Sequence, residues 1–409
     1  ADKKKLRNRL GSLEDELNHY LANEYGIDPN RKDEYEQWLE SHKPFHWFID
    51  FYRIMRRGGF DVVIGNPPYV RYSKVTKDYT VRNYATKSCG NLYAFVVERN
   101  QGLCRSKRNG MIIPSAAFGV PATAQLRDVL TKAAGSLYVS YFSGDAHPST
   151  LFEGVKLRLS IYLTTPQNKD ELTLFTTPYL RWYAEERPTL FARMKYTEIP
   201  RSLVLGTFPK CGSVSEVRVL SKLRTAGRPA GTFVLNTGRD ALYYHNAPVF
   251  FIRAMDFVPY YKSASSSAVS SNHFKTLSVS DQVLARWLIA VLNSTTFYVW
   301  FTNYSANRDL TKFDIEHTPI PFEKDKINKC ELTQLVKELM EDLKRNSAVR
   351  EYNYSTGTVR YQEFYMRQSK EIIDKIDRLL ARHYDFTDNE LDFIINYDIK
   401  YRLGLNSED

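Results

Sequence analysis

Apolar segments and helical segments alternate in the first part of this chain. The segment 60–65, Phe-Asp-Val-Val-Ile-Gly, is short, apolar and β-branched, which is typical of a strand buried on both faces of a parallel sheet. Before it, residues 6–25 place leucines near 3-4 spacing among charges, which predicts a helix. After it, residues 92–103 predict an apolar helix and residues 110–114 predict the next strand, with a basic turn at 105–108 between them. The pattern therefore predicts part of an α/β sheet.

The rest of the chain is patterned less regularly. At 409 residues it is long enough for two or three domains. Residues 170–330 mix short β-rich pieces with loops, and residues 331–409 look helical with a break near 352–357. We therefore predict a helical lead-in at 1–59, an α/β region at 60–166, a mixed α+β region and carboxy-terminal helices.

A distinctive tetrapeptide, Asn66-Pro67-Pro68-Tyr69, directly follows the first predicted strand. In open α/β folds, binding and chemistry collect at the carboxyl ends of such strands. At this place the tetrapeptide resembles motif IV of the amino-group methyltransferases, which use S-adenosylmethionine. A strand that simply ends in a Pro-Pro turn is the alternative interpretation of the same residues.

The chemistry of the tetrapeptide suits methylation of an adenine amino group, whose lone pair is delocalised into the ring. Acceptors aimed at its two N–H bonds would localise that lone pair, which is electrostatic preorganisation. The Asn66 side-chain oxygen is one such acceptor, and the Pro67 carbonyl is the other. Pro67 and Pro68 fix φ and remove N–H donors, so the loop presents its carbonyls stiffly. Tyr69 offers a face on which a flipped base can stack.

Further matches follow in the order expected for γ-type adenine-N6 DNA methyltransferases. Residues 91–95 and 110–114 resemble motifs V and VI, and by this resemblance Phe95 lies against the cofactor adenine. Phe152 occupies the place of an aromatic residue that stacks on the other face of the extruded base, and Lys156 matches a lysine near it. Phe95 and Phe152 are also compatible with ordinary core positions, because aromatic side chains at such spacing usually pack.

The cofactor-binding half of that family is missing from this sequence. No Phe-x-Gly-x-Gly or comparable glycine loop lies before residue 60, although the γ-type order places it there. Residues 43–48 are instead typical of the lead-in to motif IV in large enzymes resembling Eco57I and the type IIG restriction-modification enzymes. The chain therefore resembles the carboxy-terminal part of such a protein, with a cofactor-binding or nuclease domain expected upstream in the same polypeptide. Residues 290–298 and 308–321 resemble its target-recognition domain, and residues 376–395 resemble its closing helices.

Charge supports a nucleic-acid partner. The net charge is +10, and residues 181–230 carry ten Lys or Arg against four Asp or Glu. A basic region beside a base-modifying site suggests contacts to the phosphates of double-stranded DNA, although an ordinary solvated surface is the alternative. Arg308 and Lys312 flank a loop suited to DNA contact. The competing interpretation is that they form surface ion pairs with Asp309 or Asp314.

Other classes of protein are less compatible with the sequence. The four cysteines are scattered without metal-ligand spacing, so we expect no metal site and a reducing, cytoplasmic location. No run of about 18 apolar residues is present, so no membrane span is expected.

We interpret the chain as part of a site-specific adenine-N6 DNA methyltransferase of the Eco57I-like, type IIG group. The resemblance implies part of a Rossmann-like methyltransferase sheet followed by a target-recognition domain, within a restriction-modification or phage-defence enzyme. Two alternatives remain open at this point. One is a DNA-binding specificity module without catalysis of its own, and the other is an N-methyltransferase that acts on RNA or on a protein amide.

Overall fold

The chain folds into two compact units. The computed structural model describes residues 2–145, 150–166, 172–264, 270–355 and 357–404. The first unit contains Ala1–Gly144 and Leu151–Phe175, and the second contains Asp145–Thr150 and Thr176–Asp409. The boundary expected between residues 166 and 170 falls on a segment outside the described residues.

Helices form the amino-terminal part of the first unit. The predicted helix at residues 6–25 is confirmed as α1 (Asp2–Glu24), and α2 (Lys32–His42) follows it. Trp38 of α2 is buried and its ring lies 5.9 Å from that of Tyr25. Two single-turn helices, α3 (Trp47–Asp50) and α4 (Tyr52–Met55), then lead into the sheet.

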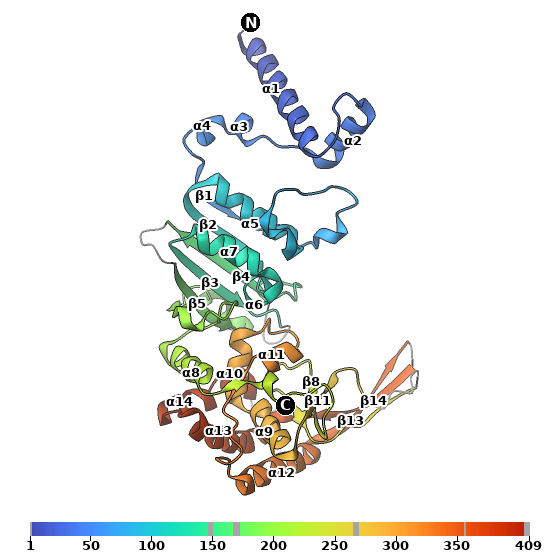
Figure 1. The fold of residues 1–409 in the computed structure, drawn as a ribbon, viewed down its shortest axis with the longest axis vertical. Helices are drawn as coiled ribbons and strands as arrows, with labels where there is room; N and C mark the ends of the chain where they lie inside the picture. The colour runs from blue at the N-terminus through green and yellow to red at the C-terminus, as the bar shows by residue number, and fades with distance from the viewer. Residues whose placement is uncertain (1, 146–149, 167–171, 265–269, 356, 405–409) are drawn as a thin grey trace. The chain divides into compact units, whose positions relative to one another are not determined.

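The first unit is built on a mixed sheet (Figure 1). Its strands are β1 (Phe60–Gly65), β2 (Cys104–Pro114), β3 (Ser136–Phe142), β4 (Leu159–Thr165) and the beginning of β5 (Thr173–Leu180), in the spatial order β1-β2-β4-β3-β5. β1 pairs with β2 in parallel, whereas β4 lies between β2 and β3 and is antiparallel to both. Consequently β1, β2 and β3 run in one direction, and their carboxyl ends meet at the same edge of the sheet.

Packing fixes this sheet against short helices. The predicted apolar helix is α5 (Leu92–Leu103), which packs on β2 and beside α7 (Ala124–Ala133) (Figure 1). Phe118 of α6 (Ala116–Gly119) is fully buried, and its ring centroid lies 6.2 Å from that of Tyr141 and 6.3 Å from that of Tyr162. These rings tie the loop after β2 to β3 and β4.

Two expectations for the sheet were wrong. β1 is the edge strand of the sheet and is not buried on both faces, since Val62 is 54% and Ile64 is 76% exposed. The basic segment at residues 105–108 is not a turn, because β2 already begins at Cys104 and continues through it. The strand is irregular there: Lys107 has a φ of 58°, and the register shifts between Phe60 and Val62 of β1.

The second unit contains β6 (Thr197–Glu198), which is the neighbour of β5 in the sheet order, and small antiparallel sheets packed with helices. Its other strands are β7 (Arg228–Pro229), β8 (Asp240–His245), β9 (Ala254–Met255), β10 (Tyr261–Ser263), β11 (Phe274–Val279), β12 (Pro319–Ile320), β13 (Ser347–Tyr354) and β14 (Gly357–Phe364). Its helices are α8 (Val214–Thr225), α9 (Gln282–Asn293), α10 (Thr295–Tyr304), α11 (Lys312–Glu316), α12 (Lys329–Arg345), α13 (Lys370–Tyr384), α14 (Asp388–Ile395) and α15 (Ile399–Leu403).

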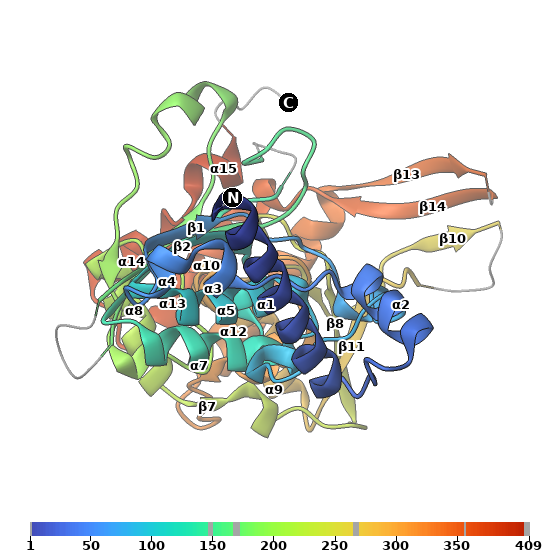
Figure 2. The ribbon, with the colours of Figure 1, turned by 90° about the horizontal axis from the view of Figure 1, so that it is seen from above.

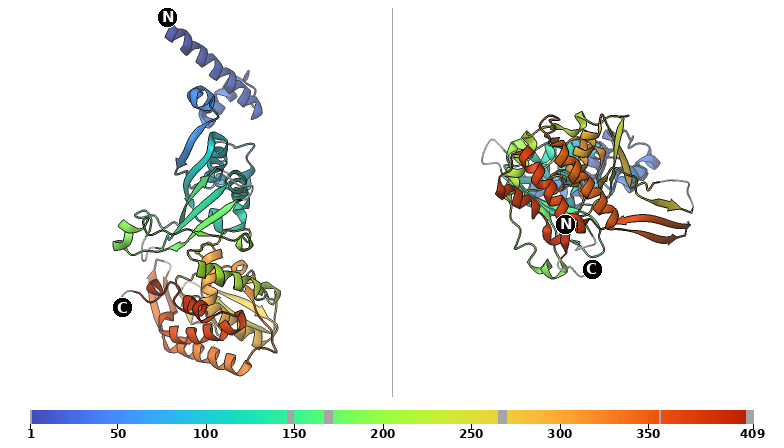
Figure 3. Two further views of the ribbon diagram at one scale, coloured as in Figure 1. Left: turned by 90° about the vertical axis from the view of Figure 1, so that its left-hand side faces the viewer. Right: turned by 90° about the horizontal axis from the view of Figure 1, so that it is seen from below.

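The expected helical break near residues 352–357 is in fact the tip of a β-hairpin. β13 and β14 pair along their whole length, and β10 pairs with the other edge of β14. This ribbon extends away from the helices of the second unit (Figures 2 and 3). Among the described helices, none is alone long and apolar enough to cross a membrane; α9 and α10 meet that test only as a pair bent by 66°.

Buried charges hold both ends of α10. The Asp377 carboxylate of α13 accepts hydrogen bonds from the backbone N–H groups of Thr295 (3.0 Å) and Thr296 (2.9 Å) at the helix N-terminus. At the other end, the Lys210 ammonium donates to three backbone carbonyls at 2.6–3.1 Å, those of Thr302, Asn303 and Ser305. Burial lowers the pKa of Lys210 to about 7. Because helix ends leave backbone groups unpaired, these two side chains satisfy what α10 itself cannot.

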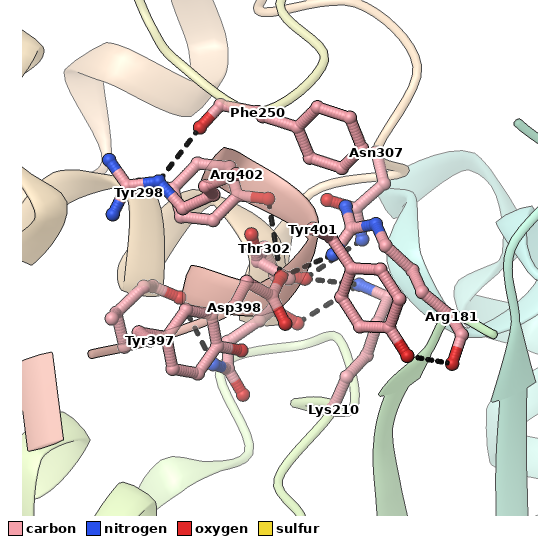
Figure 4. Close-up of polar contacts among 12 residues, drawn as sticks. Arg181, Lys210, Phe250, Tyr298, Thr302, Asn307, Tyr397, Asp398, Tyr401 and Arg402 are labelled. Atoms are coloured by element: carbon pink, nitrogen blue, oxygen red, sulfur yellow. Dashed lines mark hydrogen bonds and ion pairs between the residues drawn. The ribbon is translucent and has the colours of Figure 1, made fainter. Parts of the chain in front are cut away.

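A polar network surrounds the same helix (Figure 4). Arg181 and Asp398 form an ion pair, and the Tyr298 hydroxyl donates to the Asp398 carboxylate at 3.3 Å. Arg402 donates to the Phe250 carbonyl at 3.1 Å. The network joins the tail of the chain to α10 and to Arg181, which directly follows β5.

Candidate active site

The carboxyl edge of the parallel strands collects the residues singled out in the first unit. Asn66 follows β1, Ser115 follows β2, and the loop that contains Phe152 and Lys156 connects β3 to β4. The Ser115 backbone N–H donates to the Arg158 carbonyl at 2.9 Å, which ties the loop after β2 to the start of β4. The topology therefore brings the tetrapeptide and the candidate base-binding residues to one edge of the sheet.

Asn66 is held in an accessible position. The preceding Gly65 pairs with Met111 of β2, and a Cβ added at Gly65 would lie 3.2 Å from the Met111 sulfur. Asn66 is exposed, and within the described part of the chain its side chain makes no hydrogen bond. Pro67 is buried whereas Pro68 is exposed. The Asn66 amide is thus available to a ligand at the end of a well-fixed strand.

Tyr69 is fixed by its hydroxyl group. The hydroxyl donates to the Ile112 carbonyl of β2 at 2.9 Å, and burial raises the pKa of Tyr69. The chain that follows is paired as well, since the Leu92 N–H donates to the Val70 carbonyl at 3.0 Å and the Tyr72 N–H donates to the Gly90 carbonyl at 2.9 Å. The loop from Asn66 to Tyr72 is therefore bound at both ends, as preorganised acceptors require.

Phe95 lies in the core beside this loop. It is 6% exposed, and its ring centroid lies 5.2 Å from those of both Tyr72 and Tyr84. The sequence did not single out Glu98, whose carboxylate accepts from the backbone N–H groups of Ala85 (3.0 Å) and Thr86 (2.9 Å). Glu98 thus orders the segment before α5. The one sequence signal for this role was its position one helical turn after Phe95.

Phe152 and Lys156 lie on the surface of the β3–β4 loop. Phe152 is 42% exposed and Lys156 is exposed. The Val155 N–H donates to the Phe152 carbonyl at 3.1 Å, so the segment makes a turn. Phe152 is therefore not a plain core residue. Its contact with a base stays a prediction.

Arg308 and Lys312 are exposed in the second unit. Arg308 lies 3.6 Å from the carboxylate of Asp309, and Lys312 lies 3.4 Å from that of Glu316. The expected alternative partner of Lys312, Asp314, is instead engaged by Thr311 in a capping box at the start of α11. Such exposed pairs are worth about 0–1 kcal/mol, so they leave both side chains free to exchange a carboxylate for a phosphate.

The residues described do not form a complete cofactor cradle. The sequence lacks a glycine loop before β1, and the Phe95 ring is covered by two tyrosines. Within the described residues, no cluster of three or more His, Cys, Asp or Glu side chains could hold a metal ion.

Comparisons with known proteins find a sequence similarity within the first unit. Residues 4–145 match the sequence model of the Eco57I restriction-modification methylase family. A protein of Methanocaldococcus jannaschii that is named a type II restriction enzyme and methyltransferase is 36% identical over 95 residues, which are 23% of this chain and 8% of that protein.

Three solved structures are similar to this chain to the following degree. The DrdV–DNA complex has 10% identity and a TM-score of 0.36, over 85% of this chain and 58% of that one. A nuclease-deletion mutant of the type ISP restriction-modification enzyme LlaGI, in complex with a DNA substrate mimic, has 11% identity and a TM-score of 0.40. The match covers 74% of this chain and 37% of that one. The type IIG restriction endonuclease BpuSI has 9% identity and a TM-score of 0.31, and the match covers 83% of this chain and 54% of that one. The chain spans less than two thirds of each of these proteins. Residues 4–145 of this chain are therefore similar to the Eco57I restriction-modification methylase family.

Proposed function

We propose that this chain carries the catalytic loop and the target-recognition region of a site-specific DNA methyltransferase that modifies adenine at N6. The reaction would transfer a methyl group from S-adenosylmethionine to a flipped adenine, within a restriction-modification or phage-defence enzyme. One observation carries the proposal: Asn66-Pro67-Pro68-Tyr69 lies at the carboxyl end of β1, inside the segment that matches the methylase family, and the Asn66 amide has no hydrogen-bond partner among the described residues.

The tetrapeptide would act on the amino group of the base. The Asn66 oxygen accepts one N6–H bond and the Pro67 carbonyl accepts the other, so the nitrogen lone pair is directed out of the ring plane toward the incoming methyl group. This stabilises the transition state more than the ground state, because positive charge develops on the nitrogen only as the new bond forms. Tyr69 and Phe152 hold the two faces of the ring, and Lys156 lies near the base at the same edge.

The cofactor is proposed from the family and not from a fitted site. S-adenosylmethionine supplies the methyl group in enzymes that resemble this one. Because the chain lacks a glycine loop and Phe95 is covered, we expect the chain alone to bind S-adenosylmethionine weakly or not at all. A micromolar dissociation constant for S-adenosylmethionine in calorimetry on this chain would contradict that expectation.

The exposed edge strand suggests where the missing contacts come from. Val62 and Ile64 on β1 expose apolar side chains, and β1 has no strand partner on its outer side among the described residues. An unpaired apolar edge strand is a liability in water and is usually covered. In the complete enzyme, a cofactor-binding part would pair with β1 and cover Val62 and Ile64.

Residues 170–330 would recognise DNA, and Arg308 and Lys312 would contact it. The basic excess in this part of the chain supports phosphate contacts. The second candidate function is a DNA-binding specificity module without catalysis of its own. The unpaired outer side of β1 and the missing glycine loop favour it, because both belong to the part of the fold that usually binds the cofactor.

The reaction can be tested by the product. The complete enzyme would be incubated with methyl-labelled S-adenosylmethionine and duplex DNA, and the nucleosides would be separated after digestion. Label in N6-methyladenine is the expected result. Label in another nucleoside, in RNA, or in a protein amide instead would refute the assigned substrate.

A further inference from the structure

A row of tyrosines lines one face of the β10–β14–β13 ribbon. Tyr261 pairs with Tyr361 across β10 and β14, and Tyr354 ends β13 opposite Gly357. Because directly paired residues and alternate residues share a face of a sheet, Tyr261, Tyr354, Val359 and Tyr361 project from the same side. These four residues are called the ribbon face. The neighbouring Tyr352 is stacked on Tyr361, with 5.8 Å between ring centroids and 11° between planes.

The ribbon face forms one wall of a cavity of about 490 Å³ in the second unit. The cavity is also lined by His245 at the end of β8, Arg253 before β9, and His273 and Phe274 at the start of β11. These three rings are packed together, since the His245 ring centroid lies 5.0 Å from that of Phe274 and 5.6 Å from that of His273. Aromatic rings from both small sheets thus line the cavity.

Polar groups converge inside this cavity. The Arg253 guanidinium donates to Nδ1 of His245 at 2.9 Å, and the Ala247 N–H donates to the same nitrogen at 3.3 Å. Burial, followed by the Arg253 charge, lowers the pKa of His245 to about 3, so the ring is neutral and its proton lies on Nε2. His273 is oriented by its Nδ1, which lies 3.1 Å from the Asn246 side-chain oxygen.

Arg253 forms no ion pair in the described part of the chain, although the Glu363 carboxylate is near enough to oppose the lowering of its pKa by burial. The only carboxylate among the lining residues belongs to Glu363, which is engaged by the Arg350 guanidinium at 2.9 Å and by the Tyr365 hydroxyl at 3.0 Å. Arg253 keeps its charge, since its pKa falls only to about 10. A guanidinium whose one polar contact is a neutral imidazole retains donors for an anion.

Aromatic rings, the neutral His245 imidazole and a guanidinium without an ion-pair partner among the described residues together match a nucleotide. A base can stack on a tyrosine whatever its sequence, and a phosphate can accept from an arginine. We propose that this cavity binds one nucleotide, with its base against the ribbon face and its phosphate toward Arg253. The inference deepens the proposed DNA contact of the second unit but requires neither Asn66 nor the cofactor, so it can fail or succeed independently of methyl transfer.

Fluorescence anisotropy on the full chain, without cofactor, tests the proposal. The probe is a labelled single-stranded oligonucleotide of about a dozen thymidines, and the competitors are adenosine monophosphate, inorganic phosphate and a duplex. The test variants are Tyr354→Leu and Arg253→Gln. Tyr354 is 58% exposed, so its replacement is not expected to unfold the unit. The matched control is Arg360→Gln, which removes a charge from the opposite face of β14, where Arg360 pairs with Glu351.

Both test variants should weaken oligonucleotide binding at least about fivefold, whereas Arg360→Gln should leave it within about twofold. Adenosine monophosphate should compete with the probe. If the oligonucleotide binds much more tightly than adenosine monophosphate, the natural ligand is a nucleotide within a nucleic-acid strand. If the two affinities are equal, the natural ligand is a free nucleotide. Ultraviolet crosslinking of the probe should label the peptides that contain Tyr354 or Tyr361, which gives a readout if Arg253→Gln does not fold. Unchanged affinity in Tyr354→Leu, equal loss in Arg360→Gln, or competition by phosphate as strong as by the nucleotide would overturn the proposal.

Discussion

Replacing Asp377 by alanine should release the N-terminus of α10. The side chain is fully buried and accepts two backbone N–H bonds, from Thr295 and Thr296, and the Thr296 hydroxyl at 2.8 Å. Each orphaned N–H costs about 1–3 kcal/mol, which gives roughly 2–6 kcal/mol for the pair. Burial raises the pKa of Asp377, so removing the carboxylate also relieves a desolvation cost, and we expect a net loss of about 3 kcal/mol. For a unit of this size, that corresponds to a decrease in Tm of roughly 6–12 °C.

The assay is calorimetry of the full chain combined with hydrogen exchange of the peptide covering residues 295–304. Asp377→Asn retains an acceptor for Thr296 and should lose less stability than Asp377→Ala. The control is Asp388→Ala, since Asp388 is exposed in the first turn of α14, and it should change stability by less than about 0.5 kcal/mol. A loss below about 1 kcal/mol in Asp377→Ala, with unchanged exchange at residues 295–304, would refute the reasoning, because the buried N–H groups would then have other partners.

Three further predictions follow from the second unit. Lys210→Met should lower the free energy of unfolding by about 2–4 kcal/mol in urea denaturation, since three buried carbonyls lose their donor; a neutral effect would show that they are satisfied otherwise. His245 has a folded pKa of about 3, below its unfolded value of 6.5, so its contribution to stability is complete above pH 6.5 and is lost as the pH falls toward 3. The excess in free energy of unfolding of wild type over His245→Gln, measured by urea denaturation, should therefore become smaller from pH 7.5 to pH 5. An excess that does not change with pH would argue against a neutral buried imidazole. Arg308→Ala and Lys312→Ala should weaken duplex binding: loss on cognate and scrambled duplexes with a shallower salt slope indicates phosphate contact, loss on the cognate duplex alone indicates base readout, and no change on either would remove this loop from the DNA interface.

The sequence predicted local elements well where local composition determines them. The strand at residues 60–65 and the helix at residues 92–103 are both present. The burial of the strand was wrong because it depends on neighbours: β1 lies at the edge of the sheet, which no local pattern specifies. The basic segment at 105–108 looked like a turn, yet pairing of Cys104 with Phe60 draws it into β2, and only Lys107 keeps a turn-like φ.

The parts that the sequence did not reveal depend on contacts between distant residues. Asp377 and Lys210 bind the ends of α10 across more than eighty residues of sequence, and neither is marked by a motif. The hairpin had a signal that could have been read: Tyr352 and Tyr354 stand at alternate positions, which is the period of a strand, and Gly357 follows them at a turn position. For the candidate site, the tetrapeptide could be found because its chemistry is contained in four consecutive residues.

The most direct test of the central claim concerns Asn66. In the complete enzyme, the single-turnover rate of adenine methylation would be measured for wild type, Asn66→Ala and Asn66→Asp, together with duplex affinity. We expect Asn66→Ala to slow methylation at least about 100-fold, the usual effect of losing one preorganised polar group at a reacting centre, while duplex affinity stays unchanged. Asn66→Asp keeps an acceptor at the same position and should lose less. Methylation by Asn66→Ala within a few-fold of wild type, at unchanged duplex affinity, would contradict the assignment of this loop as the catalytic site.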